Sequence, residues 1–227
     1  VLNAVNKNDK CLVINGGTFG ARFVQLMRLY DVNYYEIKLE FNEELNDEHL
    51  SLFENKGYTK LFVQACETST GQLYDLNLIS NFCKRNDIML IVDAISSFLA
   101  DPINMMKQNI DMLITCSQKE LAIDPGLCLI LVSQKMKKEI SMNRVKSLYF
   151  NLNDYFINMK RGQPPYTPAI RQIIELKHRL ENINIQNELY INEIMKDMEK
   201  ILKCKKVELR EMVEKLSTNK KVTYKLD

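Results

Sequence analysis

Apolar residues along this chain fall into short continuous runs, separated by segments in which apolar positions recur every three or four residues. Such runs occupy residues 11–15, 88–92, 111–116 and 128–132, and two segments in which polar residues interrupt the apolar ones, 32–39 and 60–66, also read as strands. Short apolar runs that end in turn residues are typical of buried strands. Strands that alternate with helices, through connections of about twenty residues, predict a largely parallel sheet with right-handed crossovers.

The helical spacing predicts where the chain crosses between these strands. Helices are expected after the turn at 15–20, over about 46–56, around 76–83, after 101–102, over 134–161 and from near 168. The same stripe of apolar positions returns at 191–202 and at 209–216, which predicts further helical structure near the end of the chain.

The composition narrows the functional classes. Among 227 residues, 46% are hydrophobic and 26% charged, as in ordinary globular domains, and the net charge of +2 argues against a nucleic-acid binder. No apolar run approaches the length of about 20 residues that a membrane span needs, so a cytoplasmic protein is expected. The six cysteines include no C-x-x-C pair, which favours reduced thiols. Two distant histidines give little basis for a metal site, and none is predicted.

Three glycines follow the first predicted strand, Gly16, Gly17 and Gly20, and they allow a tight turn into a helix. Such a turn can bind a phosphate at the helix N-terminus. The GGxxG spacing matches neither the dinucleotide fingerprint nor the Walker sequence, so a plain structural turn is the alternative interpretation.

Two polar residues stand where a ligand of a parallel sheet is expected. Asp93 follows the run at 88–92, and Lys119 follows the run at 111–116. Open α/β sheets bind ligands beyond the carboxyl ends of their strands. Alone, Asp93 could cap a helix and Lys119 could be a solvated loop residue. Together they fit pyridoxal phosphate, whose ring nitrogen binds a carboxylate and whose aldehyde binds a lysine.

Four motifs then carry a resemblance to a known family: ETSTG at 67–71, VDAISS at 92–97, SQKEL at 117–121 and DPG at 124–126. In this order they resemble the class V aminotransferases among the fold-type I pyridoxal-phosphate enzymes, in particular the alanine–glyoxylate, serine–glyoxylate and 2-aminoethylphosphonate transaminases. The likeness runs from about residue 11 to about residue 180.

The resemblance implies an α/β protein with a three-layer α/β/α large domain and a mostly parallel sheet. Its expected boundaries are 1–162 for the large domain, whose N-terminal part would be missing, 163–184 for a long connecting helix, and 185–227 for the incomplete start of a small C-terminal domain. Relatives begin upstream with a Ser/Gly-rich phosphate loop, and they continue beyond residue 227 to an arginine that binds the substrate carboxylate. The chain therefore resembles the middle of such an enzyme, and weak cofactor binding is expected.

The resemblance also implies a reaction. Lys119 would form an imine with pyridoxal phosphate and then move a proton between the substrate α-carbon and the cofactor, while Asp93 keeps the ring nitrogen protonated. A small amino donor, such as alanine, serine or 2-aminoethylphosphonate, would give its amino group to a 2-oxo acid, pyruvate or glyoxylate. Two alternatives stay open: a lyase on the same scaffold, and a non-catalytic fragment that serves as a fold or assembly module.

Further contacts follow from the same resemblance. Phe19 and Ile95 would cover opposite faces of the cofactor ring, and Thr68 would bond its phenolic oxygen. From residues alone, Phe19 could equally be a core residue, and the hydroxyl of Thr68 could bond the local backbone.

The phosphate of the cofactor would have contacts from two segments. Ser117 and Gln118 would bind it from the same subunit. In a homodimer, Thr167 would reach across to the cofactor phosphate of the partner. The family has an aromatic residue three positions before this threonine, and Pro164 stands there instead.

Overall fold

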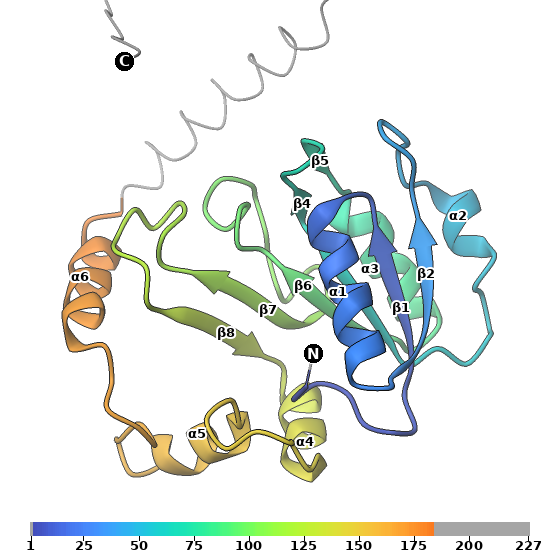
Figure 1. Cartoon of the computed structure of the whole chain (residues 1–227). Coiled ribbons are helices and arrows are strands. Elements are labelled where there is room, and N and C mark those ends of the chain that lie inside the picture. The colour runs from blue at the N-terminus through green and yellow to red at the C-terminus, as the bar shows by residue number, and fades with distance from the viewer. Residues whose placement is uncertain (1, 184–227) are drawn as a thin grey trace, which may run out of the picture. The chain divides into compact units, whose positions relative to one another are not determined.

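A six-stranded sheet in the order β2-β1-β3-β6-β7-β8 forms the centre of the computed structural model, which describes residues 2–183 (Figure 1). Its strands are β1 (Lys10–Asn15), β2 (Asn33–Lys38), β3 (Lys60–Gln64), β6 (Met89–Asp93), β7 (Ile110–Cys116) and β8 (Cys128–Val132). All neighbours are parallel except β8, which runs antiparallel to β7 at one edge. The predicted strands and the mostly parallel sheet are confirmed.

The remaining elements are six helices and a small hairpin within the described residues. The helices are α1 (Thr18–Leu29), α2 (Asp47–Ser51), α3 (Leu76–Arg85), α4 (Gln134–Met142), α5 (Leu152–Met159) and α6 (Ile170–Glu181). The hairpin pairs β4 (Cys66–Glu67) with β5 (Gln72–Leu73) directly after β3. Residues up to Asn182 form one compact unit. Within residues 2–183, no helix is long and apolar enough to cross a membrane.

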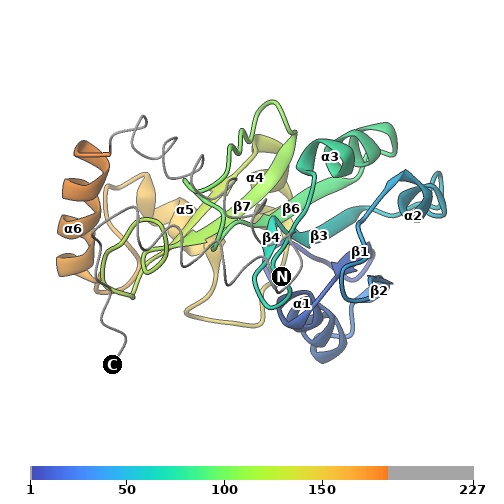
Figure 2. The ribbon, with the colours of Figure 1, turned by 90° about the horizontal axis from the view of Figure 1, so that it is seen from above.

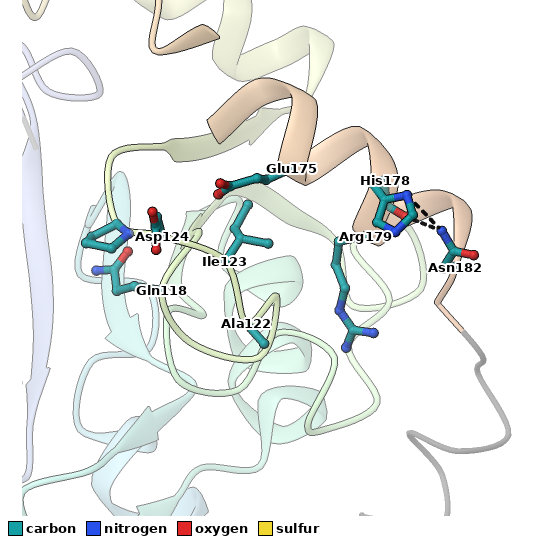
Figure 3. Close-up of a pocket in the computed structure, with 9 residues that line it drawn as sticks. Gln118, Ala122, Ile123, Asp124, Glu175, His178, Arg179 and Asn182 are labelled. Atoms are coloured by element: carbon teal, nitrogen blue, oxygen red, sulfur yellow. Dashed lines mark hydrogen bonds between the residues drawn. The ribbon is translucent and has the colours of Figure 1, made fainter. Parts of the chain in front are cut away.

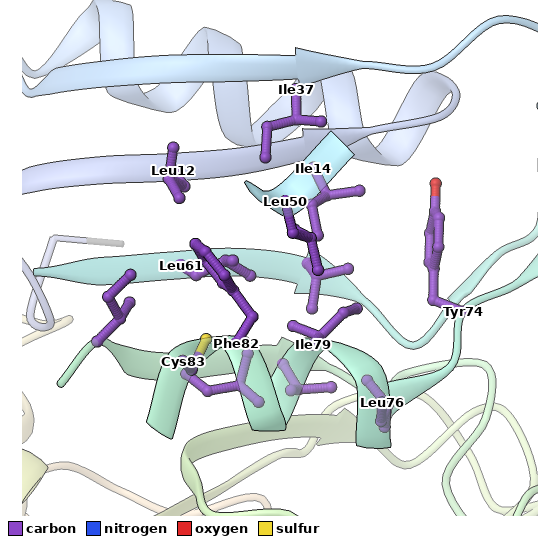
Figure 4. Packing of buried hydrophobic residues seen from close by; sticks show 14 of the residues in the cluster. Leu12, Ile14, Ile37, Leu50, Leu61, Tyr74, Leu76, Ile79, Phe82 and Cys83 are labelled. Atoms are coloured by element: carbon purple, nitrogen blue, oxygen red, sulfur yellow. The ribbon is translucent and has the colours of Figure 1, made fainter. Parts of the chain in front are cut away.

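The four inner strands, β1, β3, β6 and β7, are largely apolar because both of their faces are buried, whereas the edge strands β2 and β8 are mostly exposed or half-buried. Alternate residues of β1 show this: Leu12 and Ile14 pack beneath α2 and α3, whereas Cys11 and Val13 pack beneath α1 and α4. Figure 4 shows the first of these clusters between α3 and the sheet, and Figure 2 shows α1 and α3 on opposite sides of the strands. The two clusters make the three layers that the sequence predicts.

Two of the helix predictions are wrong in extent. The helix expected over 46–56 stops at Ser51, because Asn55 and Gly57 adopt positive φ angles of 55° and 71° in the turn that leads into β3. The helix expected over 134–161 divides into α4 and α5. It breaks where the side-chain amide of Asn143 donates to the backbone oxygens of Asn3, at 3.0 Å, and Val5, at 3.3 Å.

Three other sequence predictions need comment. No helix follows 101–102; residues there form a bridge between Phe98 and Asp101 and then turns. The expected strand at 60–66 ends at Gln64, and the chain then enters the β4–β5 hairpin. The helices predicted at 191–202 and 209–216 lie outside the described residues.

A buried ion pair closes the amino ends of the strands. Lys60, the first residue of β3, is 1% exposed, and its Nζ lies 2.5 Å from Oδ2 of Asp9. The other oxygen of Asp9 accepts a hydrogen bond from Oγ1 of Thr59 at 2.8 Å, and Oδ2 also accepts from the backbone N–H of Asn6 at 2.7 Å. The carboxylate of Glu139 on α4 adds a second negative charge 3.8 Å from Lys60. Hydrogen bonds and the ion pair with Lys60 therefore satisfy both oxygens of the buried Asp9 carboxylate.

Replacing Lys60 by Met should lower the free energy of unfolding by about 3–5 kcal/mol, because Asp9 would stay buried without its cation. Lys135→Met is the matched control, since Lys135 pairs with Asp87 at the surface and such pairs contribute about 0–1 kcal/mol. Urea denaturation of both variants gives the two values. Equal midpoints for the two variants would contradict a structural role for the buried pair.

Candidate functional site at the carboxyl edge of the sheet

The carboxyl ends of three neighbouring strands meet at one edge of the sheet. In the parallel ladder, Gln64 at the end of β3 pairs with Asp93 at the end of β6, and Asp93 pairs with Ile114 near the end of β7. The loop that carries Lys119 leaves β7 after Cys116. Topology therefore brings the predicted carboxylate and the predicted lysine loop to the same edge.

Asp93 is a half-buried carboxylate with few partners. Its Oδ1 accepts the backbone N–H of Ile95 at 2.9 Å, and it takes part in none of the ion pairs among residues 2–183. Burial raises the pKa of Asp93, and the negative charge of Glu67 raises it further, against the opposing effect of the Ile95 N–H. A cation placed beside Asp93 would relieve this cost. The protonated ring nitrogen of pyridoxal phosphate fits that requirement.

Glu67, which the sequence analysis did not assign to the site, is the most enclosed charged group at this edge, with 0% exposure. Its Oε2 accepts the backbone N–H groups of Phe19, at 3.0 Å, and Gly20, at 2.8 Å, in the first turn of α1. Its Oε1 accepts the hydroxyl of Ser69 at 2.6 Å. The N-terminus of α1 is therefore occupied by a carboxylate of the protein itself, which favours the plain structural turn over a phosphate site at the glycines.

Phe19 is held through its backbone on both sides. Glu67 binds its N–H, and its carbonyl oxygen accepts the side-chain amide of Gln64 at 3.0 Å. Phe19 as a whole is 38% exposed, and the guanidinium of Arg22 lies 5.5 Å from its ring centroid. A partly exposed ring on a fixed backbone fits the predicted stacking contact better than a core residue.

The loop after β7 is organised by Ser117. The hydroxyl of this buried residue donates to the backbone oxygen of Asp124 at 2.8 Å and accepts the backbone N–H of Leu127 at 3.2 Å. Gln118 and Lys119 are exposed, and the carbonyl oxygen of Lys119 accepts the N–H of Ala122 at 2.8 Å. The loop thus has internal order, and the amine of Lys119 is accessible.

The other predicted cofactor contacts, Ile95, Thr68 and Thr167, differ in exposure. Ile95 follows Asp93 and is half-buried, as a residue that covers a bound ring would be. Thr68 is exposed beside Glu67, and its hydroxyl forms no hydrogen bond within residues 2–183. Thr167 is exposed just before α6, and no described contact joins it to Asp93 or Lys119.

A cleft of about 770 Å³ lies between the Ser117 loop and α6 (Figure 3). Gln118 and Asp124 line it from the loop, and Glu175 and His178 line it from the helix. The guanidinium of Arg179 ties the two sides together, since its Nε donates to the backbone oxygen of Leu121 at 3.2 Å. No sequence pattern indicates this cleft, because its two walls are far apart in the chain: 58 residues separate Leu121 from Arg179.

Comparisons with known proteins identify relatives of this chain. Residues 2–222 match the family described as aminotransferase class V. The chain is 32% identical over 186 residues to an uncharacterized aminotransferase of Methanocaldococcus jannaschii, an alignment that covers 80% of this chain and 48% of that protein. It is 28% identical over 161 residues to the 2-aminoethylphosphonate–pyruvate transaminase of Bacteroides fragilis, covering 70% of this chain and 44% of that enzyme.

Among solved structures, the alanine–glyoxylate aminotransferase of Nostoc sp. is similar with a TM-score of 0.77 and 23% identity, over 88% of this chain and 54% of that one. This likeness confirms the predicted fold, the mostly parallel sheet with flanking helices of the fold-type I enzymes. The chain spans about half the length of the curated relatives it matches.

Glu67→Gln should lower the free energy of unfolding by about 1.5–3 kcal/mol, the usual contribution of a hydrogen bond to a charged group. Both carboxylate oxygens now accept hydrogen bonds, one from the N–H of Gly20 and the other from the hydroxyl of Ser69. In either orientation of the new amide, its NH2 group would replace one of these acceptors. Thr68→Ala, next in the chain but exposed, should change stability by less than about 0.5 kcal/mol. Urea denaturation measures both; a Glu67→Gln midpoint equal to that of the wild type would refute the role of this carboxylate.

Asp93→Asn should raise the thermal stability of the chain without cofactor at neutral pH. Because the pKa of Asp93 is raised in the folded chain, its ionised form lowers the free energy of unfolding. This penalty is fully present above the folded pKa and disappears as the pH falls below the ordinary carboxyl range. The amide oxygen of Asn can still accept the N–H of Ile95. Thermal melts at about pH 8 and about pH 4 should show a gain that shrinks with acidity, whereas exposed Glu44→Gln should show none.

Proposed function

Because the chain belongs to the class V aminotransferase family, we propose that it forms the central part of a pyridoxal-phosphate-dependent transaminase, with Lys119 and Asp93 as its catalytic residues. The proposed reaction transfers an amino group from a small amino compound to a 2-oxo acid. The names of relatives support this class: one acts on 2-aminoethylphosphonate and pyruvate, and another is an alanine–glyoxylate aminotransferase.

The observation that carries the proposal is the topology that brings a carboxylate and an amine to the end of β7. Asp93 at the end of β6 pairs with Ile114 near the end of β7, and Lys119 follows shortly after Cys116, the last residue of β7. In agreement with this placement, the pKa of Cys116, which is raised mainly by burial, also responds to the opposite charges of Asp93 and Lys119. A ligand with an aldehyde at one end of its ring and a basic nitrogen at the other needs such a pair.

Pyridoxal phosphate, when bound, supplies an aldehyde and an electron-accepting ring. In the proposed mechanism, the anionic Asp93 holds a proton on the ring nitrogen, because its desolvated carboxylate favours a neighbouring cation. Lys119 would provide the accessible amine that holds the aldehyde end of the cofactor, and it would move a proton at the substrate α-carbon.

Neighbouring residues would orient the ring and the phosphate. Phe19, on its fixed backbone, and Ile95 would cover the two ring faces, and the exposed hydroxyl of Thr68 would bond the phenolic oxygen. Gln118 would bind the phosphate through its exposed amide, with Ser117 beside it. Thr167 would contact the cofactor phosphate of a second copy in a homodimer.

Reduction with borohydride in the presence of pyridoxal phosphate tests the proposal directly. The wild-type chain should show an absorption band near the visible edge and should then carry a covalent adduct mapped to Lys119. Lys119→Ala should lose the adduct completely. Lys107→Ala, which removes another exposed loop lysine, should keep it.

One outcome would overturn the assignment of Lys119, and another would overturn cofactor binding by this chain on its own. An adduct that persists in Lys119→Ala and maps to surface lysines would show non-specific reaction with the aldehyde. No band and no adduct in a wild-type chain that is folded by circular dichroism would show that residues 1–227 alone do not bind the cofactor.

A further inference from the structure

Two cysteines face each other where the Ser117 loop leaves the sheet. Cys116 is the last residue of β7 and Cys128 the first of β8, and the two are direct partners in the antiparallel ladder. Neither is in a disulfide in this structure. The loop of residues 117–127, which contains Lys119, begins and ends at this pair.

Backbone hydrogen bonds at both ends of the ladder determine the class of the pair. At one end, the N–H of Ser133 donates to the oxygen of Asp111 at 2.8 Å, and at the other the N–H of Ser117 donates to the oxygen of Leu127 at 3.1 Å. Hydrogen-bonded and non-hydrogen-bonded pairs alternate along an antiparallel ladder. Counting from either end places the cysteine pair in the non-hydrogen-bonded class.

This class brings side chains closest together. Directly opposite residues share one face of the sheet, and their Cα atoms in non-hydrogen-bonded pairs are about 4.5 Å apart. Disulfides span Cα separations of about 4.4–6.8 Å. The Cα separation typical of this class therefore lies at the lower end of the range that a disulfide spans, so the register of the two strands suits a bond between these cysteines.

The two thiols differ in access. Cys128 is exposed and can meet a reagent in solution, whereas Cys116 is buried. Desolvation raises the pKa of both thiols, and the neighbouring thiol of Cys116 raises that of Cys128 further. At Cys116 this is partly opposed by the backbone N–H of Gln118 and the charge of Lys119, which favour its thiolate.

We propose that Cys116 and Cys128 form a reversible disulfide with each other, across the two strands. The oxidant is a low-molecular-weight disulfide such as glutathione disulfide. The thiolate of Cys128 attacks the small disulfide and releases one glutathione thiolate. The thiolate of Cys116 then attacks the sulfur of Cys128 and releases the second. Two protein thiols are oxidised and one glutathione disulfide is reduced to two glutathione molecules, with both protons passing to the leaving thiolates.

The bond would join the two ends of the loop of residues 117–127. Hydrogen bonds of Ser117 to Asp124 and Leu127 already hold this loop together, and the disulfide would restrict it further. A restricted Lys119 would make cofactor attachment respond to the redox state, and this consequence rests on the proposed function. Formation of the bond itself does not depend on the cofactor.

The test equilibrates the purified full chain, without pyridoxal phosphate, in buffers of defined glutathione and glutathione disulfide content. Acid quenching, alkylation of remaining thiols and peptide mapping then locate the bonds. We expect a loss of about 2 Da per chain and one linked peptide that joins Cys116 to Cys128, both reversed by dithiothreitol. The rate should rise about tenfold per pH unit near neutrality, because the thiolate is the attacking species.

Variants make the assignment specific. Cys116→Ser and Cys128→Ser should each abolish the linked peptide, and Cys128→Ser should also abolish the mixed disulfide. Cys66→Ser, a partly buried cysteine near the same edge, should leave the linkage unchanged. A linkage to another cysteine, Cys204 included, or a stable glutathione adduct on Cys128 with Cys116 still alkylated, would overturn the proposal. The linkage is measured without pyridoxal phosphate, so its outcome does not depend on whether Lys119 binds the cofactor, and failure of one proposal is distinguishable from failure of the other.

Discussion

The arrangement of the carboxyl edge depends on the buried carboxylate of Glu67. The first turn of a helix has N–H groups without internal partners and a partial positive charge, and Glu67 supplies oxygens and negative charge to both. Its contacts join α1 to the end of β4, although 47 residues separate Glu67 from Gly20. Glycine permits this approach, because a Cβ on Gly17 would lie 2.8 Å from the Cδ atom of Glu67.

The two ends of the sheet therefore differ in electrostatic character. At the amino edge, the negative charge of Asp9 is neutralised by Lys60, and the remaining oxygens have hydrogen bonds. At the carboxyl edge, Glu67 is hydrogen-bonded, and Asp93 has a raised pKa and no ion pair within residues 2–183. An uncompensated buried carboxylate lowers stability, and it gains stability when a cation binds. Asp93 therefore lowers the stability of the chain at the edge of the sheet where the cationic ring of the proposed cofactor would bind.

The sequence predicts well what depends on local pattern. Residues such as Cys11 and Leu12 alternate between two buried faces, so β1 reads as a continuous apolar run. Asp93 and Lys119 are candidates because each follows such a run, and their role stays a prediction. The features it misses depend on distant partners. Asn143 ends α4 by bonding Asn3, which is 140 residues away. Periodicity carries no trace of that bond.

Register is another property that local pattern leaves open. Cys116 and Cys128 are unremarkable members of two apolar runs, and they become partners only once the loop between them fixes how the strands align. Glu67 shows the same limit, since an acidic residue after a strand is usually a solvated loop residue. Its partners are backbone N–H groups, which carry no residue identity that a motif could contain.

Ser117 has two competing roles: the family resemblance implies a phosphate contact, whereas in the structure its hydroxyl holds the loop together. A serine hydroxyl has a single proton to donate, and that of Ser117 goes to the backbone oxygen of Asp124. A phosphate needs donors, so Ser117 could serve it only by releasing Asp124 and with it part of the loop. The amide of Gln118 carries two donor protons on an exposed side chain. Gln118 is therefore the better candidate of the two for the proposed phosphate contact, and Ser117 is the residue that shapes the loop.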